Sequence, residues 1–320
     1  MQAPSATKVV NEVRDATLKY LWRQWRAVGA TVTGSGQANA IVDPEVLILA
    51  SLWMMDFERR LVDVTTSWVS INSSLLSIQR LGNLRDQFPK PVAERLAALA
   101  VVGIEAAKDQ RWQSLRRREA ADLGARGDKV RAVEVRFSSW ATLLLQLRRG
   151  MGVGAKADVL AFLLGTNETQ AEWASVATIA DAICYTPAAV RRVADDLAAA
   201  KFIRVPGTTA TEHDLQRMYS GDPAAWAQLL RVARHHTGWG YWRERLLFII
   251  DLLTWIRSLS EREVTAYAGD VEARELLTRH SAALLRDRVI DPIEYAGAEL
   301  DLAYLEKAAV TLTNWMENQG

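Results

Sequence analysis

The stretch SVATIADAICYTPAAVRRVADDLAAAKFIRV, residues 175 to 205, contains two helical patterns that meet at a short turn. The first pattern covers Val176 to Ala182, and residues 184 to 186, Cys-Tyr-Thr, form the turn. Thr186 is a favourable N-cap for the second helix, and Pro187 fits its first position because no amide hydrogen is needed there. The stretch therefore predicts a helix, a three-residue turn and a second helix that reaches Ala200.

The second predicted helix has two chemically different faces. Spacing of i, i+3, i+4 and i+7 places apolar side chains on one face, namely Val190, Val193, Ala194 and Leu197. The other face begins with small residues and then carries Arg191 and Arg192. A helix that enters the major groove of DNA needs little bulk near its N-terminus and arginines that reach phosphates or guanine edges. We therefore expect this helix to contact DNA.

The segments on either side of this pair of helices have their own patterns. Ala155 to Leu164 is apolar with helical spacing, which predicts a helix before the pair. After the pair, KFIRV (residues 201 to 205) has strand character, PGTTATEHD is turn material, and LQRMY (residues 215 to 219) alternates like a second strand. A β-hairpin that follows a recognition helix is a wing.

With these elements, residues from Ala155 to about Leu230 resemble the winged helix-turn-helix of bacterial regulators of the MarR and ArsR kind. The resemblance implies sequence-specific binding of double-stranded DNA, with Thr186 to Ala200 in the major groove and the wing tip, Gly207 to His213, at the DNA backbone. The DNA-binding residues that follow from it are Thr186, Ala188, Ala189, Arg191, Arg192, Lys201, Arg204, Thr208 and Thr209.

Charge in the same region leaves a second interpretation open. Asp195 and Asp196 follow Arg191 and Arg192 by one turn, where i, i+4 pairs would reduce the charge that the helix offers to phosphate. The wing tip contains almost no Lys or Arg. The alternative is therefore a winged fold that binds a partner protein, such as an antitoxin or a component of a defence system.

Residues 43 to 88 repeat the order of three helices, in DPEVLILASLW, ERRLVDVTTSWV and SIQRLGNLRDQF. In the third segment the spacing places Ile78, Leu81 and Phe88 inward. It places four polar side chains outward, namely Gln79, Arg80, Asn83 and Gln87. Gln, Arg and Asn make bidentate contacts with base edges, so this region is either a degenerate second DNA-binding unit or an ordinary three-helix layer with a polar face.

The start of this region, TGSGQANAIVDPEV, also has an enzymatic interpretation. Gly34 and Ser35 followed by Asp43 and Glu45 would suit a nucleotidyltransferase that holds a nucleotide and Mg²⁺. Pro44 argues against it, because proline fits poorly in the central strand that such an enzyme needs. Asp43 as N-cap with Pro44 at the first helical position satisfies the rules of helix entry instead, so we expect a helix here and no enzyme.

Composition limits the remaining possibilities. The 320 residues are 49% hydrophobic and 24% charged with a net charge of +1, which is typical of a globular protein and not of a general polyanion binder. Cys184 is the single cysteine, and the four histidines lack a ligand spacing, so we expect no metal and no cofactor. The apolar runs are too short for a membrane span, and the first residues lack a signal-peptide core, so we expect a cytoplasmic protein that does not enter a membrane.

The expected fold is mainly α, with a winged helix-turn-helix and a small β-hairpin wing between helical regions. The expected parts are an N-terminal helix (1–30), a helical domain (31–121), a linker and connecting helix (122–150), the winged helix-turn-helix (151–222) and a helical region for dimerisation or partner binding (223–320). Because one recognition helix covers a small footprint, we expect a homodimer that binds a palindromic site as a transcriptional regulator.

Overall fold

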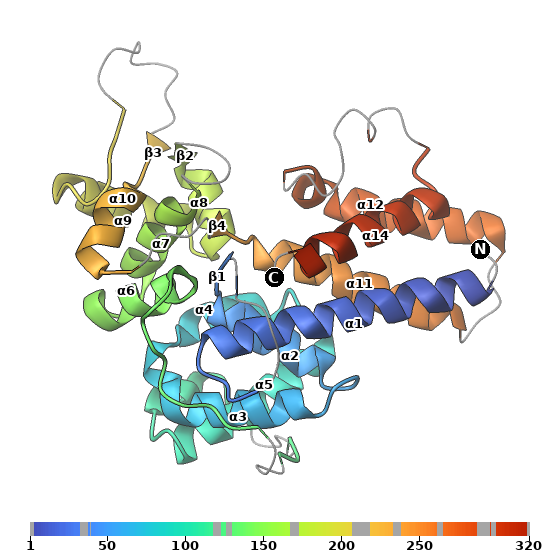
Figure 1. The fold of residues 1–320 in the computed structure, drawn as a ribbon, viewed down its shortest axis with the longest axis horizontal. Coiled ribbons are helices and arrows are strands. Elements are labelled where there is room, and N and C mark those ends of the chain that lie inside the picture. The colour runs from blue at the N-terminus through green and yellow to red at the C-terminus, as the bar shows by residue number, and fades with distance from the viewer. Residues whose placement is uncertain are drawn as a thin grey trace. The chain divides into compact units, whose positions relative to one another are not determined.

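The computed structural model describes residues 3–32, 38, 40–117, 123–125, 130–166, 173–206, 218–232, 238–260, 265–286, 295 and 299–318. It is mainly helical, with 71% of the residues in helices, as the sequence predicts. The chain divides into two compact units (Figure 1): a terminal unit of Met1–Arg23 with Tyr241–Gly320, and a central unit of Gln24–Gly240. None of the described helices combines the length and apolarity that a bilayer span requires.

The terminal unit brings the two ends of the sequence together. Its described helices are the first part of α1 (Ala3–Ala27), with α11 (Trp242–Ser260), α12 (Ala266–Arg286) and α14 (Leu302–Asn318). Tyr20 packs on Trp242 with ring centroids 4.3 Å apart, and the Arg245 guanidinium lies 3.7 Å from the centroid of Trp315. Arg23 donates to the carbonyl of Glu317 at 3.3 Å and so satisfies the end of α14.

The central unit contains most of the buried apolar side chains and two short sheets. Its core includes Trp25 and Trp68, whose rings meet edge to face at 6.1 Å and whose indole nitrogens donate to Ser51 Oγ and the Val28 carbonyl. Its described helices are α2 (Pro44–Met54), α3 (Arg60–Asn72), α4 (Ile78–Arg85), α5 (Lys90–Glu105), α6 (Leu143–Met151), α7 (Ala155–Thr166), α8 (Val176–Ile183), α9 (Pro187–Ala199) and α10 (Pro223–Leu230), with short 3-10 helices at Ser73–Leu75, Gln110–Ser114 and Trp140–Thr142.

Two helix starts confirm the capping predictions. The Asp43 carboxylate accepts the amide of Val46 at 3.2 Å, and Pro44 occupies the first position of α2. Thr186 Oγ1 accepts the amide of Ala189 at 3.3 Å at the start of α9, with a proline again at the first position. Both helices therefore begin at the residues that the sequence predicts.

Short strands accompany the helix pair α8 and α9. β2 (Ala174–Ser175) pairs antiparallel with β3 (Met218–Tyr219), and Arg204 forms an antiparallel bridge with Ser220 at the end of β3. The predicted strand over residues 201 to 205 is therefore wrong in extent, because Lys201 at φ 60° still belongs to the turn that ends α9. The expected wing tip, including Thr208 and Thr209, lies outside the described residues.

A second pair of strands lies elsewhere in the central unit. β1 (Ala40–Ile41) runs parallel to β4 (Gly238–Trp239), and α7 packs against β4. Residues 157 to 166 of α7 are all buried, so the other elements of the central unit enclose this helix. A helix with apolar side chains on every side has to be enclosed in this way.

Candidate nucleic-acid interface

Helix α9 has the two faces that its sequence predicts. Val190, Ala194 and Leu197 are buried against the rest of the unit. The opposite face is exposed at Thr186, Ala188, Arg191 and Arg192, whereas Ala189 is half-buried. The buried face anchors the helix, and the exposed face presents two guanidinium groups after a small-residue start.

The acids of α9 do not pair with its arginines. Asp195 accepts a hydrogen bond from the hydroxyl of Tyr219 at 2.7 Å, and Asp196 lies 3.9 Å from the ammonium of Lys156. Within the described part of the chain, the side chains of Arg191 and Arg192 make no hydrogen bond and no ion pair. Both guanidinium groups lie on the exposed face of the helix.

The basic residues that follow α9 differ in how freely they can reach a ligand. Lys201 is exposed at the end of the helix. Arg204 donates to Ser220 Oγ at 3.1 Å and to the carbonyl of Gly221 at 3.2 Å, and it lies 5.8 Å from the ring of Trp173. Arg204 thus already donates hydrogen bonds to residues at the end of β3, whereas Lys201 is exposed in the turn after α9.

The predicted polar face of α4 is present with one exception. Gln79, Asn83 and Gln87 are exposed, and Ile78, Leu81 and Phe88 are buried as predicted. The expectation that Arg80 points outward is wrong, because its side chain is 1% exposed. A helical repeat cannot reveal this, since the acids that attract Arg80 come from distant parts of the sequence.

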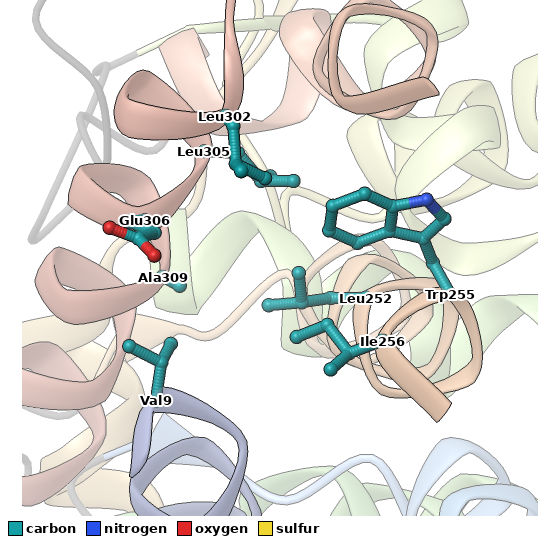
Figure 2. Close-up of a pocket in the computed structure, with 8 residues that line it drawn as sticks. All are labelled: Val9, Leu252, Trp255, Ile256, Leu302, Leu305, Glu306 and Ala309. Atoms are coloured by element: carbon teal, nitrogen blue, oxygen red, sulfur yellow. The ribbon is translucent and has the colours of Figure 1, made fainter. Parts of the chain in front are cut away.

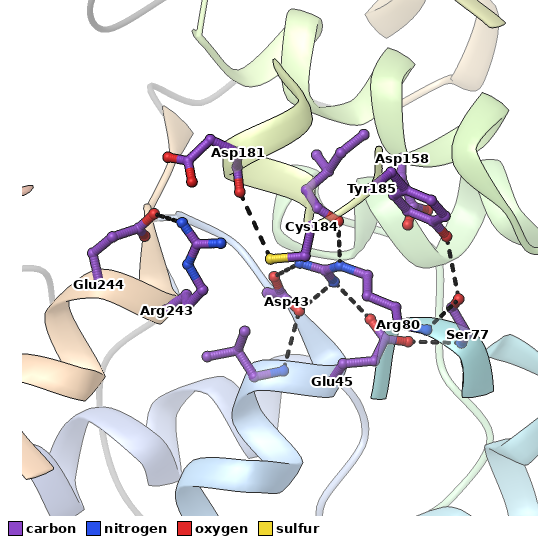
Figure 3. A network of polar contacts seen from close by, with 12 residues as sticks. Asp43, Glu45, Ser77, Arg80, Asp158, Asp181, Cys184, Tyr185, Arg243 and Glu244 are labelled. Carbon is purple, nitrogen blue, oxygen red and sulfur yellow. Dashed lines mark hydrogen bonds and ion pairs between the residues drawn. The ribbon is translucent and has the colours of Figure 1, made fainter. Parts of the chain in front are cut away.

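Arg80 lies in a buried cluster of ions (Figure 3). Its Nη1 lies 2.7 Å from Asp43 Oδ1 and 2.8 Å from Glu45 Oε2, and its Nη2 also pairs with Asp43. Its Nε donates to the carbonyl of Ile183 at 2.8 Å. A guanidinium with this many partners within 3 Å is unable to contact DNA.

Arg148 completes the cluster from α6. It pairs with Glu45 at 2.6 Å and with Asp158 at 2.8 Å, and it donates to the carbonyl of Leu75 at 3.0 Å. Arg148 is buried, whereas its neighbour Arg149 is exposed. The sequence of α7 contained a signal, because Asp158 is the one acid in a helix that is apolar apart from Lys156 and Thr166.

The same cluster connects α4 to the turn between α8 and α9. Besides the bond from Arg80 to Ile183, Asn83 Nδ2 donates to the carbonyl of Cys184 at 3.2 Å. The hydroxyl groups of Ser77 and Tyr185 lie 3.2 Å apart (Figure 3). One face of α4 thus holds the turn that immediately precedes α9, and α4 supports the helix pair in addition to its outward polar side chains.

Electrostatics explains why the ions tolerate burial. Burial alone would raise the pKa of Asp43, but the charge and hydrogen bonds of Arg80 outweigh it and hold that pKa below its usual range. Burial would lower the pKa of Arg148, and the carboxylates of Asp158 and Glu45 raise it above its usual range instead. Tyr185 has a raised pKa because of burial first and the nearby Asp158 second, so its hydroxyl keeps its proton.

This arrangement bears on the enzymatic interpretation of Asp43 and Glu45. Both carboxylates bind guanidinium groups, and Asp43 caps α2, so the helix-entry interpretation is confirmed. Gly34 and Ser35 lie outside the described residues. Among the side chains that the structure describes, no three His, Cys, Asp or Glu residues are grouped as metal ligands. That the chain is not an enzyme stays a prediction.

The terminal unit contains a small cavity among α1, α11 and α14 (Figure 2). Its volume is about 10 Å³, and its lining consists of Val9, Leu252, Trp255, Ile256, Leu302, Leu305, Glu306 and Ala309. A site for a small organic ligand needs several hundred Å³, whereas this volume accommodates about one water molecule. The cavity therefore does not provide an effector site.

Comparison of the chain with protein-family models, with curated proteins and with solved structures gives no match.

The buried cluster generates a stability prediction. Arg148→Met should lower the free energy of unfolding by about 3 to 5 kcal/mol, because it leaves the buried Asp158 without its cation and leaves Glu45 with Arg80 alone. The neighbouring Arg149→Met removes an exposed arginine and should change the free energy by no more than about 0.5 kcal/mol. Urea unfolding followed by circular dichroism measures both. Equal effects of the two substitutions would contradict the burial of Arg148.

The lowered pKa of Asp43 generates a prediction about pH. In the parent protein, the stability that Asp43 contributes is complete above its unfolded pKa of about 3.9 and is lost as the pH falls through its lower folded value. In Arg80→Met the buried carboxylate lacks its cation and takes up a proton more readily. The difference in the free energy of unfolding between the parent and Arg80→Met should therefore be largest at neutral pH and become smaller as the pH falls.

Urea unfolding of the parent and of Arg80→Met at several pH values measures this deficit. Arg80→Lys, which keeps the charge, should show a smaller deficit at neutral pH. A deficit of Arg80→Met that stays constant between neutral and acidic pH would show that Arg80 acts only through its packing.

Proposed function

We propose that this protein is a DNA-binding transcriptional regulator whose central unit contains a winged helix-turn-helix. The order of elements supports the proposal: α7, β2, α8, α9, the bridge at Arg204 and then β3. β3 pairs with β2 in a two-stranded sheet, and Ser220, which follows β3, forms an isolated bridge with Arg204. A helix pair followed by paired strands is the order of elements in a winged helix-turn-helix, and this order supports the proposal.

The exposed face of α9 is the observation that carries the proposal. Arg191 and Arg192 are exposed and have no partner among the described residues, and the small Ala188 lies one turn before them. Phosphate oxygens and guanine edges are the groups that such arginines bind. With a net charge of only +1, binding then depends on this local face and not on a general positive field.

The proposed regulator acts in the cytoplasm, without a catalytic activity or a cofactor, as a homodimer on a palindromic site. One helix reads only a few base pairs, so two copies related by a two-fold axis would supply the footprint of a specific site. Contacts of Gln79, Asn83 and Gln87 with DNA remain part of the proposal as secondary contacts. Gln79 and Asn83 are exposed on α4, which supports the α8 to α9 turn, and Gln87 is exposed in the turn after α4.

A second candidate function, binding of a partner protein, is favoured by apolar side chains beside the strands. Phe202 is 44% exposed, Val205 53% and Leu229 68%. Trp226 packs edge to face on Phe202 and donates to its carbonyl at 3.2 Å, so these residues of the segment after α9 and of α10 lie together. Phe202 and Trp226 thus contact each other, and exposed apolar side chains near such a pair are typical of surfaces that bind proteins.

DNA binding is tested with a pool of duplexes that have a randomised centre. The parent protein should enrich one sequence from this pool. Arg191→Ala and Arg192→Ala should each weaken binding to the enriched duplex by about 1 to 3 kcal/mol, roughly 5- to 150-fold. If the arginine reads a base, its replacement by alanine reduces the preference of the protein for the enriched duplex over random DNA. If the arginine contacts a phosphate, its replacement weakens binding to both duplexes alike and lowers the salt slope by about one unit.

Arg136→Ala is the matched control, because Arg136 is an exposed arginine in the segment of residues 130 to 138, outside α9. Its affinity should equal that of the parent. If Arg191→Ala/Arg192→Ala stays folded and binds the enriched duplex like the parent, α9 is not the recognition helix. If the parent enriches no sequence and binds random DNA only weakly, the partner-protein function takes its place.

The homodimer is tested on the enriched duplex by sedimentation velocity. We expect two protomers on each duplex and an inverted repeat in the enriched sequence, because the two-fold axis of a dimer matches the symmetry of a palindrome. One protomer on a site without symmetry would contradict the dimer and leave the DNA-binding proposal standing.

A further inference from the structure

The segment of residues 110 to 117 follows α4 along its length. Arg111 donates to two backbone carbonyl groups directly before α4, at 3.0 and 3.2 Å. In the middle of α4, the side chain of Leu115 lies 3.7 Å from the place where a β-carbon on Gly82 would stand, which is van der Waals contact. The residues that follow Leu115 therefore lie toward the C-terminal end of α4.

This segment and the turn before α9 lie on different sides of α4. With 3.6 residues per turn, Gly82 and Asp86 share one side of the helix, and Gly82 faces the segment. Arg80 and Asn83 share another side, which donates to carbonyl groups at the α8 to α9 turn. Gln79, three residues before Gly82 and four before Asn83, is exposed between the two sides. The solvent-exposed side of α4 therefore separates the start of α9 from the end of the segment.

The C-terminal end of α4 has more positive than negative charge around it. Arg116 and Arg117 are exposed, and within the described ranges neither side chain makes a hydrogen bond or an ion pair. The carboxylate that Arg117 approaches is Asp86, to which Arg85 Nε already donates at 2.9 Å. The pKa of Asp86 lies below its usual range because of Arg85 first and, more weakly, because of the charge of Arg117. Three guanidinium groups thus accompany one carboxylate, which leaves an excess of two positive charges.

The width of α4 matches the dimensions of double-stranded DNA. An α-helix with its side chains is about 10 to 12 Å across, and the major groove is about 12 Å wide. When α9 enters the groove, cations across α4 from its first residues lie about one groove width away, where the backbone that borders the groove runs. Phosphate contacts of this kind fix the position of a protein on the duplex and read no sequence.

We propose that Arg116 and Arg117 bind the phosphate backbone of the same DNA whose major groove α9 enters. The proposal rests on the proposed function and deepens it, because it adds a backbone contact on the side of α4 that faces away from the α8 to α9 turn. Two guanidinium groups in an irregular segment supply charge and no recognition helix, so they strengthen binding to every duplex sequence alike. Asp86 limits this attraction, since its carboxylate repels the same phosphates.

The test measures binding to the duplex enriched by the parent and to random duplex over a range of salt concentrations, with circular dichroism to verify folding. Arg116→Gln/Arg117→Gln removes both charges and keeps polar side chains. It should bind both duplexes about 10- to 100-fold more weakly, with an unchanged preference for the enriched duplex and a salt slope lower by about two units. Each single replacement should lower the slope by about one unit.

Two further variants control for general electrostatics and for damage to the fold. Arg131→Gln/Arg136→Gln removes two exposed arginines from the segment of residues 130 to 138, which bonds to α3. Its affinity should stay within about twofold of the parent at an unchanged slope. Asp86→Asn removes the carboxylate and should bind both duplexes about two- to fivefold more tightly, a gain that a damaged fold does not produce.

The proposal is overturned if Arg116→Gln/Arg117→Gln is folded and binds like the parent at an unchanged slope, or if the control pair is weakened as much. A reduced preference for the enriched duplex would also overturn it, because the two arginines would then contact bases. If the double variant does not fold, the two single variants decide, and an unchanged slope in both contradicts the phosphate contact. Asp86→Asn that binds no more tightly than the parent contradicts it as well.

Failure of the proposed function has a different signature. In that case the parent itself prefers no duplex over random DNA, and the phosphate contact is overturned together with the recognition helix. When the parent enriches a sequence and Arg191→Ala or Arg192→Ala weakens its binding, α9 stands as the recognition helix. If the glutamine variants then bind like the parent, only the contact of Arg116 and Arg117 with phosphate is wrong.

Discussion

Two buried arginines hold the central unit in its arrangement. Arg80 and Arg148 share the carboxylate of Glu45, and each has a further acid of its own, Asp43 and Asp158. Ions without water are stable only when partners surround them at short distances, so the helices that carry them have little freedom to shift. The cluster thereby restricts the relative positions of α2, α4, α6 and α7 more tightly than apolar packing alone would.

The function that we propose depends on this rigidity. Arg80 and Asn83 of α4 donate to carbonyl groups of the turn between α8 and α9, and α9 begins directly after that turn. A recognition helix contacts DNA at its N-terminal end, so the direction of its first residues decides which bases it meets. The ion cluster therefore lies behind the proposed interface as its support, whereas the arginines of α9 form the interface.

Local rules predicted the parts of the fold that depend on neighbouring residues. The caps at Asp43 and Thr186 and the two faces of α9 follow from spacing within one helix, and the structure confirms them. Arg80 was placed on the wrong face because its partner Asp43 is 37 residues away, and Arg148 lies 103 residues from Glu45. No helical repeat contains such contacts. The two-residue strand β2 was missed because it is too short for any alternation.

The cluster also constrains how this sequence can change over time. It contains three acids and two bases, so replacement of either arginine strands the acid that pairs with it alone, and replacement of any of the acids leaves an arginine with one acid in place of two. A neutral apolar core at the same place needs several replacements at once, since the intermediates are less stable than either end point. Positions 43, 45, 80, 148 and 158 should therefore change together: a related sequence should either keep all five charged residues or have replaced all five.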